Sequence, residues 1–293
     1  MKLILTLPGL GLLAAFAALP STARAAESFD NCRGFIDSLP ATINTQGVWC
    51  LRKDLATAQA TGESIRIWTN NVTIDCNGYK LGGLAAGAAT QTTGIMTNSA
   101  TNVTVRNCNI RGFQQGLQLY GTAEGYGGHL VEDNRFEGNT SEAINVGGDG
   151  TVVRRNLVLD TGGGSGGGSP SGINANGNID IVDNIISGAM AGNDSTAAPS
   201  GIKAIGNTSG TISGNRIRRL VPLGTYFYGI ILNGAGTPVV AGNHIVLHPA
   251  PAGNGYGVRC NSSSTALVRD NVISGFTFDI SACIDAGGNY SPP

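Results

Sequence analysis

The chain has 293 residues, a formal net charge of −1 and only 13% charged residues. This balance, without a basic stripe, argues against nucleic acid as a main partner. Glycine is abundant at 45 residues, but no G-x-y period occurs and valine and isoleucine are plentiful, which excludes collagen and disorder.

Residues 1–25 have the features of a secretory signal peptide. Lys2 precedes a long apolar run, and ARA at 23–25 is a small-x-small cleavage site. Pro8 and Pro20 interrupt the run, and no basic stop-transfer cluster follows, so a membrane anchor is the less favoured alternative. No later stretch is apolar enough to span a bilayer. We therefore expect an exported protein, periplasmic or extracellular, with no integral membrane span after signal removal.

Residues 26–70 precede the repeats described next. An open solenoid end exposes a strand edge, so we expect this segment to form an N-terminal cap. Within it, DLATAQA (54–60) suits a short helix. Residues 71–293 are then the solenoid domain, with 276–293 as its C-terminal closing segment.

A short motif recurs along this domain: an aliphatic residue, two variable positions, a polar residue, one variable position and another apolar residue. The polar position falls at 77, 108, 134, 156, 184, 215, 243 and 271, with spacings from 22 to 31 residues. Each copy is followed by a second element, usually glycine plus an aliphatic residue, as in Gly201-Ile202. Periods of 20 to 50 residues indicate a solenoid.

The elements of this solenoid are predicted to be strands. Apolar residues alternate with period two, β-branched residues dominate, and glycine and asparagine clusters leave no room for helices. Such short strands cannot bury an apolar face alone, but they can when equivalent strands pair in parallel about 4.8 Å apart. The predicted fold is all-β: a single-stranded parallel β-helix of about eight coils.

The recurring polar residue needs an explanation, because asparagine is depleted in strands. Alternation places it inward at a corner of each coil, where stacked amides can bond one another and the backbone. We interpret these positions as an architectural ladder, with Cys108 filling one place as a small buried thiol. The predicted ladder comprises Asn77, Cys108, Asn134, Asn156, Asn184, Asn215, Asn243 and Asn271.

All six cysteines follow the cleavage site, and in an exported protein an even number permits disulfides. None is spaced as C-x-x-C, which gives a zinc site or a thioredoxin-like motif little support. Fifteen pairings are possible. Order along the chain favours Cys32–Cys50 and Cys260–Cys283, one near each end.

The segment NNVTIDCNGYKLGG (70–83), followed by VTVRNCNIRGF and the N-x-I repeats, resembles the right-handed parallel β-helix repeat proteins of the pectate-lyase-like superfamily. The resemblance covers about residues 65 to 285. It implies a right-handed coil, in agreement with the crossover rule. The family holds polysaccharide lyases, hydrolases, epimerases, tailspikes and proteins without known chemistry, so the resemblance specifies fold rather than activity.

The connections between the N-x-I strand and the G-I strand vary greatly in length, and coil stacking should gather them along one edge. Amides, two cations and aromatic rings then line a groove that suits a sugar chain. The candidate substrate-binding residues are Asn145, Asn174, Tyr226, Tyr228, His248 and Tyr256. The candidate catalytic residues are Lys203, Arg259, Asp160 and Asp194.

These residues predict an exported protein that binds a polysaccharide or cell-surface glycan, with catalysis left open. In a lyase, Lys203 or Arg259 would neutralise the uronate and abstract its neighbouring proton, with Tyr228 or Tyr256 assisting. In a hydrolase, Asp160 and Asp194 would be the carboxylate pair. The alternatives are a non-catalytic binding module and a structural or surface-interaction solenoid.

No metal or other cofactor is expected. The three histidines, His129, His244 and His248, have no ligand spacing. If the protein is a lyase, Ca²⁺ becomes a possible cofactor. The acidic residues beside the ladder, however, form no tight carboxylate cluster to hold it.

Overall fold

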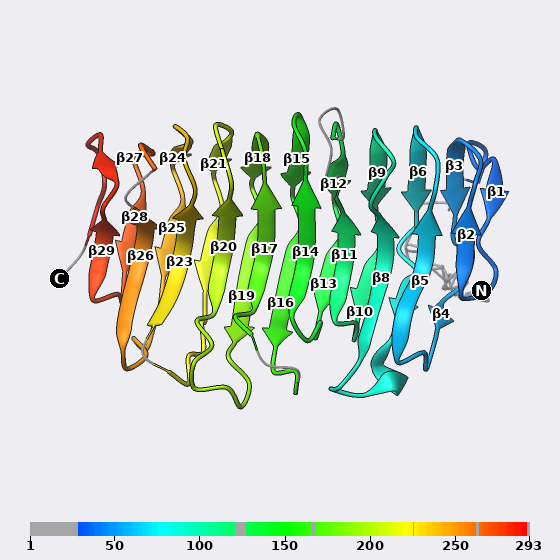
Figure 1. Cartoon of the computed structure of the whole chain (residues 1–293), viewed down its shortest axis with the longest axis horizontal. Helices are drawn as coiled ribbons and strands as arrows, with labels where there is room; N and C mark the ends of the chain where they lie inside the picture. The colour runs from blue at the N-terminus through cyan, green and yellow to red at the C-terminus, as the bar shows by residue number, and fades with distance from the viewer. Residues whose placement is uncertain (1–28, 121–126, 166–167, 225, 262–263, 292–293) are drawn as a thin grey trace, which may run out of the picture.

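The computed structural model describes residues 29–120, 127–165, 168–224, 226–261 and 264–291. The predicted signal peptide, residues 1–25, lies outside these ranges. The described chain winds into a parallel β-helix, so the predicted fold class is confirmed (Figure 1). The strands form three parallel sheets, and from β3 onward each coil passes through sheet 1, sheet 2 and sheet 3 in that order.

Sheet 1 has eleven strands, each leading into the corner that holds the polar ladder position. They are β1 (Gly34–Phe35), β3 (Gly47–Cys50), β6 (Val72–Asp75), β9 (Val103–Arg106), β12 (Leu130–Glu132), β15 (Thr151–Arg154), β18 (Ile179–Val182), β21 (Thr211–Ser213), β24 (Val239–Ala241), β27 (Leu267–Arg269) and β30 (Ile284–Asp285).

Sheet 2 has nine strands, which follow that corner. They are β4 (Leu55–Ala56), β7 (Lys80–Gly82), β10 (Asn109–Arg111), β13 (Arg135–Glu137), β16 (Leu157–Gly162), β19 (Ile185–Met190), β22 (Arg216–Arg218), β25 (His244–Val246) and β28 (Val272–Ser274).

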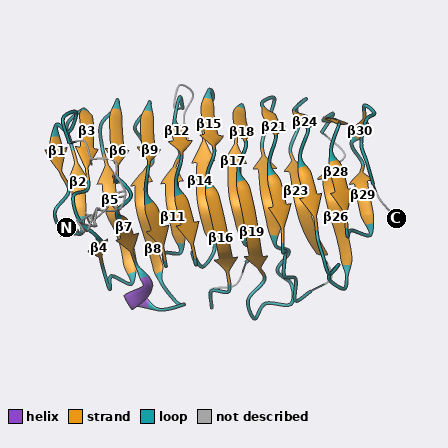
Figure 2. Cartoon of the chain, turned by 180° about the vertical axis from the view of Figure 1, so that it is seen from behind, coloured by secondary structure: helices purple, strands orange, loops and turns teal. Residues whose placement is uncertain are grey.

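Sheet 3 has ten strands and contains the glycine–aliphatic element. They are β2 (Ala41–Ile43), β5 (Thr61–Ile67), β8 (Gln91–Thr97), β11 (Gln115–Leu119), β14 (Glu142–Gly147), β17 (Ser171–Asn176), β20 (Ser200–Ile205), β23 (Tyr226–Asn233), β26 (Asn254–Cys260) and β29 (Phe278–Ser281). One short 3₁₀ helix, η1 (Leu84–Ala86), lies between β7 and β8. Figure 2 shows the same sheets from behind.

The sheets extend beyond the eight coils that carry the repeat. Strands β1 to β5 pair in register with the coils that follow them, and β29 and β30 extend sheets 3 and 1 at the other end. The helix expected over residues 54–60 is wrong, because Leu55 and Ala56 pair with β7 as strand β4. Pairing with a neighbouring coil overrides the weak helix propensity of this short stretch.

The core consists of columns of like side chains, one column per sheet. Sheet 3 contributes Ile144, Ile173 and Ile202 in consecutive coils, and these side chains are fully buried. Because the strands pair in parallel and in register, each aliphatic side chain contacts its equivalents in the coils on both sides. The alternation of apolar residues within each strand and the repeat period between coils together therefore determine which side chains form the core.

The recurring glycine of sheet 3 is required by close packing between coils. A Cβ on Gly201 would lie 2.6 Å from Cγ2 of Ile217 and 2.8 Å from the carbonyl oxygen of Gly229. A Cβ on Gly229 would likewise lie 2.4 Å from Cγ2 of Ile245. Neither position has room for a side chain, which explains why glycine precedes the aliphatic residue in most coils.

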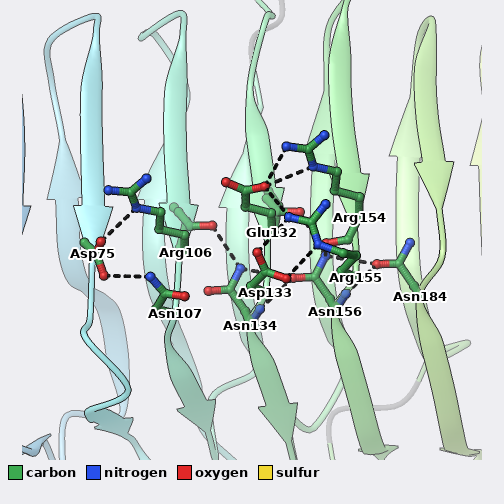
Figure 3. Close-up of polar contacts among 12 residues, drawn as sticks. Asp75, Arg106, Asn107, Glu132, Asp133, Asn134, Arg154, Arg155, Asn156 and Asn184 are labelled. Atoms are coloured by element: carbon green, nitrogen blue, oxygen red, sulfur yellow. Dashed lines mark hydrogen bonds and ion pairs between the residues drawn. The ribbon is translucent and has the colours of Figure 1, made fainter. Parts of the chain in front are cut away.

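The asparagine ladder runs through the corner between sheets 1 and 2. From Asn134 to Asn271, each Nδ2 donates to the Oδ1 of the next asparagine at 2.9–3.0 Å. Each Oδ1 also accepts the backbone N–H of the preceding asparagine, as Asn184 does from Asn156. Asn289, which lacks the repeat motif, accepts the last bond from Asn271. Figure 3 shows the ladder at Asn134, Asn156 and Asn184.

Two predicted ladder positions differ from the expectation. Asn77 lies in a half-exposed turn with φ of 49°, and its Nδ2 donates to the carbonyl of Leu51. This turn has four residues, 76–79, where the next coil has two, 107–108, so Asn77 falls out of step with the ladder. Cys108 donates its backbone N–H to Oδ1 of Asn134 but carries a disulfide rather than a free thiol.

Three disulfides connect neighbouring parts of the solenoid. The predicted pairs Cys32–Cys50 and Cys260–Cys283 are present, and Cys76–Cys108 is the third. Cys32–Cys50 thus links the coils of β1 and β3, Cys76–Cys108 links the coils of β6 and β9, and Cys260–Cys283 links the last coils, while the described coils between Cys108 and Cys260 carry none. No helix in the described ranges has the length and apolar character to cross a membrane.

Candidate functional site

The outer side of sheet 3 carries columns of side chains in register. The first column includes Gln115, Glu142, Tyr228, Tyr256 and Phe278. The second column is Met96, Gln118, Asn145, Asn174, Lys203, Ile231, Arg259 and Ser281. The longer connections from sheet 2 to sheet 3 lie along one edge of the solenoid, the lower edge in Figure 1. The predicted groups therefore share one rigid face.

The aromatic side chains at the C-terminal end of this face stack on one another. The ring centroids of Tyr228 and Tyr256 are 5.6 Å apart, and those of Tyr256 and Phe278 are 5.0 Å apart, with interplanar angles of 24° and 19°. The spacing between coils produces this stack, because residues in register repeat about every 4.8 Å. The rings of Tyr228 and Phe278 thus cover both faces of Tyr256, so sugar stacking on that ring, as expected from the sequence, is blocked.

Other aromatic surface on this face is open. Tyr226 and Phe278 are each 45% exposed, and the ring of Tyr226 lies 6.4 Å from that of Tyr256. A ligand on the outer side of the stack could therefore contact ring edges, the terminal rings and tyrosine hydroxyls, but not a row of separately exposed ring faces.

Arg259 lies over this stack. Its guanidinium carbon is 4.5 Å from the ring centroid of Tyr256 and 5.7 Å from that of Tyr228, within the range of a cation–π contact. Its Nη1 donates to the Tyr228 hydroxyl at 3.4 Å. Burial raises the pKa of Tyr228, although the charge of Arg259 acts in the opposite direction. Tyr228 therefore stays a neutral hydroxyl beside a fixed cation.

The middle of the face is polar and pre-arranged around Glu142. Oε2 of Glu142 accepts from Nε2 of Gln115 at 2.7 Å, and Oε1 accepts from Nδ2 of Asn174 at 2.7 Å. These bonds span three coils and hold the carboxylate in one place. Asn174 is only 9% exposed, and its Oδ1 is buried without a partner in the described part of the chain.

Lys203 follows Asn174 in the second column. Among the residues that the structure describes, Lys203 and Arg259 have no carboxylate partner. Two unpaired cations thus lie two coils apart, separated by Ile231. At about 4.8 Å per coil, their backbones are about 10 Å apart along the axis.

The two candidate carboxylates of the loops have other partners. Asp160 forms an ion pair with Arg219, which reaches across from a later coil. Asp194 accepts from the backbone N–H of Thr196 at 2.8 Å, from its hydroxyl at 2.6 Å, and from the backbone N–H of Gly168 at 3.2 Å. The bond from the Thr196 hydroxyl is the main reason that the pKa of Asp194 is lowered. Asp160 lies in strand β16 rather than in a loop and is ion-paired, while Asp194 fixes a loop.

The remaining candidates are Asn145 and His248. Asn145 occupies the second column between Gln118 and Asn174. His248 is exposed and precedes a cis proline, Pro249, in a loop beyond sheet 2.

Glu142 was not among the predicted site residues, because these came from the loops and from the position after the aliphatic residue of each glycine–aliphatic element. Alignment of the repeats could have identified it. Glu142 precedes Ala143, and this is the position that Tyr228 and Tyr256 occupy in their own repeats.

No group of three histidine, cysteine, aspartate or glutamate side chains in the described ranges is placed to hold a metal ion. The expectation that the protein needs no cofactor stays a prediction.

No protein-family model and no curated protein sequence matches this chain. Among solved structures, it is similar to the A-module of the mannuronan C-5 epimerase AlgE6 of Azotobacter vinelandii, with 12% identity, a TM-score of 0.44, and coverage of 86% of this chain and 85% of that one. It is also similar to the catalytic domain of Agl-KA, with 12% identity, a TM-score of 0.35, and coverage of 86% and 58%. Neither likeness says what this chain does.

Proposed function

We propose that the protein is exported and binds an acidic polysaccharide along the outer face of sheet 3, between Glu142 and Phe278. The observation that carries this proposal is the pair of unpaired cations, Lys203 and Arg259, aligned in one column of a rigid sheet. Acidic sugar chains bear carboxylates at regular intervals, and their hydroxyls bond amides and tyrosine hydroxyls. Three disulfides agree with export, into the periplasm or out of the cell.

Binding, rather than cleavage, is the function that the geometry supports best. A hydrolase needs two carboxylates with a defined separation, whereas Asp160 is ion-paired with Arg219 and Asp194 stabilises a loop. In a lyase, Lys203 or Arg259 would abstract the proton beside the uronate. The tyrosine that would assist such a base, Tyr228, bonds Arg259. Lys203 has no tyrosine hydroxyl among its partners in the described part of the chain and therefore lacks this assistance.

Calorimetric titration with a panel of polyuronates and neutral polysaccharides tests the proposal. We expect an acidic polymer to bind with an affinity that falls as salt increases. Lys203→Ala and Arg259→Ala should each weaken binding about tenfold or more, because each removes a charge-assisted hydrogen bond. Arg52→Ala is the matched control, since it removes an exposed arginine between β3 and β4, outside sheet 3. If no polymer binds, or if neither variant differs from the control, the proposal fails.

The same polymers separate binding from turnover. New unsaturated ends, followed by absorbance, would identify a lyase, and new reducing ends without unsaturation would identify a hydrolase. Retained binding with neither product would identify a non-catalytic module. If neither product nor binding appears with any polymer, the structural or surface-interaction solenoid becomes the better interpretation.

A further inference from the structure

A concave surface lies on a different wall of the solenoid from sheet 3. It is an open groove of about 660 Å³ over β22, β25 and β28 of sheet 2. Its volume falls within the range of ligand pockets and far exceeds what a single ion needs. Its lining comprises Gly214, Arg216, Ile217, Arg218, Gly242, Asn243, His244, Val246, Asp270 and Val272.

The hollow arises at the corner beside the ladder. The residue before each ladder asparagine has a positive φ, and in other coils this position carries a side chain, as at Asp133, Arg155 and Asp183. In two of the three coils that form the groove it is Gly214 and Gly242, and in the third it is Asp270. Nothing lies within 4 Å of where a Cβ on Gly242 would be, so the space above that glycine is open, whereas the Asp183 carboxylate occupies the space at Gly214.

Two exposed arginines line this hollow. Arg216 and Arg218 are two residues apart on strand β22, so both side chains lie on the outer face, with their backbones about 7 Å apart. His244 pairs in register with Arg216 on the next coil and extends the polar row. Val246 and Val272 supply apolar surface beside them.

These arginines differ from most others in having no carboxylate partner. Arginines elsewhere form ion pairs with nearby carboxylates, namely Arg52, Arg66, Arg106, Arg135, Arg154, Arg155, Arg219 and Arg269. Within the described ranges, neither Arg216 nor Arg218 has one within 4 Å. Of the carboxylates at the groove, Asp270 is bonded to Arg269 at 2.6 Å, and Asp183 lies against Gly214 at the groove's edge. Arg216 and Arg218 therefore bring two positive charges to the groove that no ion pair within the described ranges neutralises.

We propose that this groove binds the anionic groups of a sugar chain, either uronate carboxylates or sulfate esters, as a second site separate from sheet 3. Two arginines that flank an open cavity can each form paired hydrogen bonds with one oxyanion. The apolar side chains between them can contact the sugar rings. Two cations are too few for a membrane surface, which recruits clusters of four to eight. This site stands whether or not sheet 3 binds a polysaccharide.

Titration of a short oligouronate and a sulfated oligosaccharide into the isotopically labelled protein, followed by amide NMR, tests the proposal. We expect at least one of them to shift the amides of β22 and β25, independently of any shifts in β20 and β26. The double variant R216Q/R218Q should weaken binding at the groove at least tenfold, because two charge-assisted contacts are lost. Arg52→Gln, which removes an exposed, ion-paired arginine far from both sites, should change nothing.

The double variant K203A/R259A separates the two sites. In this background the groove should keep its affinity, and adding R216Q/R218Q should remove it. If groove affinity stays within twofold after R216Q/R218Q, or if neither oligosaccharide shifts β22 or β25, the proposal is overturned. Shifts by inorganic sulfate without oligosaccharide binding, or an arginine-dependent affinity for anionic lipid vesicles alone, would overturn the assignment to a glycan.

Discussion

In this fold, the burial and hydrogen bonds of a single residue depend on the coils on either side of it. His129 is buried, and its Nδ1 accepts the backbone N–H of Val103 at 3.3 Å. The ring proton therefore lies on Nε2, which is buried without a partner in the described part of the chain. Protonation of Nδ1 would break the bond to Val103 and place a charge in the core, so burial lowers the pKa of His129 to about 4.

This histidine predicts a loss of stability in mild acid. The unfolded chain binds a proton at His129 below about pH 6.5, whereas the folded chain does so only near pH 4. The contribution of His129 to stability is complete above pH 6.5 and is lost as the pH falls toward 4. The loss amounts to about 3 kcal/mol. Urea unfolding of the wild type and of His129→Gln at pH 7 and pH 4.5 measures how much the free energy of unfolding of each protein changes between the two pH values.

Glutamine at position 129 keeps an acceptor for Val103 but does not titrate. The variant should therefore lose less stability than the wild type between the two pH values, and the exposed His244→Gln should behave like the wild type. Equal pH dependence in all three proteins would contradict the assignment of a buried neutral histidine.

At the scale of the element, the corner asparagine links three coils. Nδ2 of Asn215 donates to the carbonyl of Ile181 at 2.8 Å and to Oδ1 of Asn243 at 3.0 Å. Its Oδ1 accepts both the side chain and the backbone N–H of Asn184. Because the site is fully buried, water cannot replace these partners.

Asn215→Ala should therefore destabilise the protein by at least about 3 kcal/mol, since several buried polar groups lose their partners at once. Denaturant unfolding checks this value. Asn145→Ala is the matched control, because Asn145 is half-buried on the outer face, and it should cost less than about 0.5 kcal/mol. Similar losses in the two variants would mean that the ladder contributes no more than a surface amide.

The elements that repeat could be predicted from the sequence. The ladder from Asn134 to Asn271 and the aliphatic columns follow from period and alternation. Asn77 could not be placed, because two extra residues in its turn shift it out of step.

Contacts that depend on both neighbouring coils could not be predicted either. The position of Glu142 between Gln115 and Asn174 requires knowing which residues come into register after loops of unequal length. The same limit applied to the aromatic stack, where the sequence indicated exposed rings but not that Tyr256 is covered on both faces.

For the whole molecule, a solenoid distributes its stability along its axis, since each coil contacts only its neighbours. Two of the described disulfides, Cys32–Cys50 and Cys260–Cys283, involve the outermost coils, and Cys76–Cys108 joins the coils of β6 and β9, which have neighbours on both sides. In chain order, the three disulfides close loops with sequence separations of 18, 32 and 23 residues. Chain entropy assigns about 3 to 4 kcal/mol to each cross-link of this length.

Removing the C-terminal cross-link should therefore loosen one end and leave the middle intact. In the double variant C260A/C283A, we expect faster amide hydrogen exchange in β26 to β30 and unchanged exchange in β11 to β17. The terminal coils lose a tether, while the central coils keep neighbours on both sides. Cys283 is only half-buried, so its loss leaves little cavity in the core. If exchange instead accelerates equally in every coil, the molecule unfolds as one cooperative unit and the coil-by-coil account of its stability is wrong.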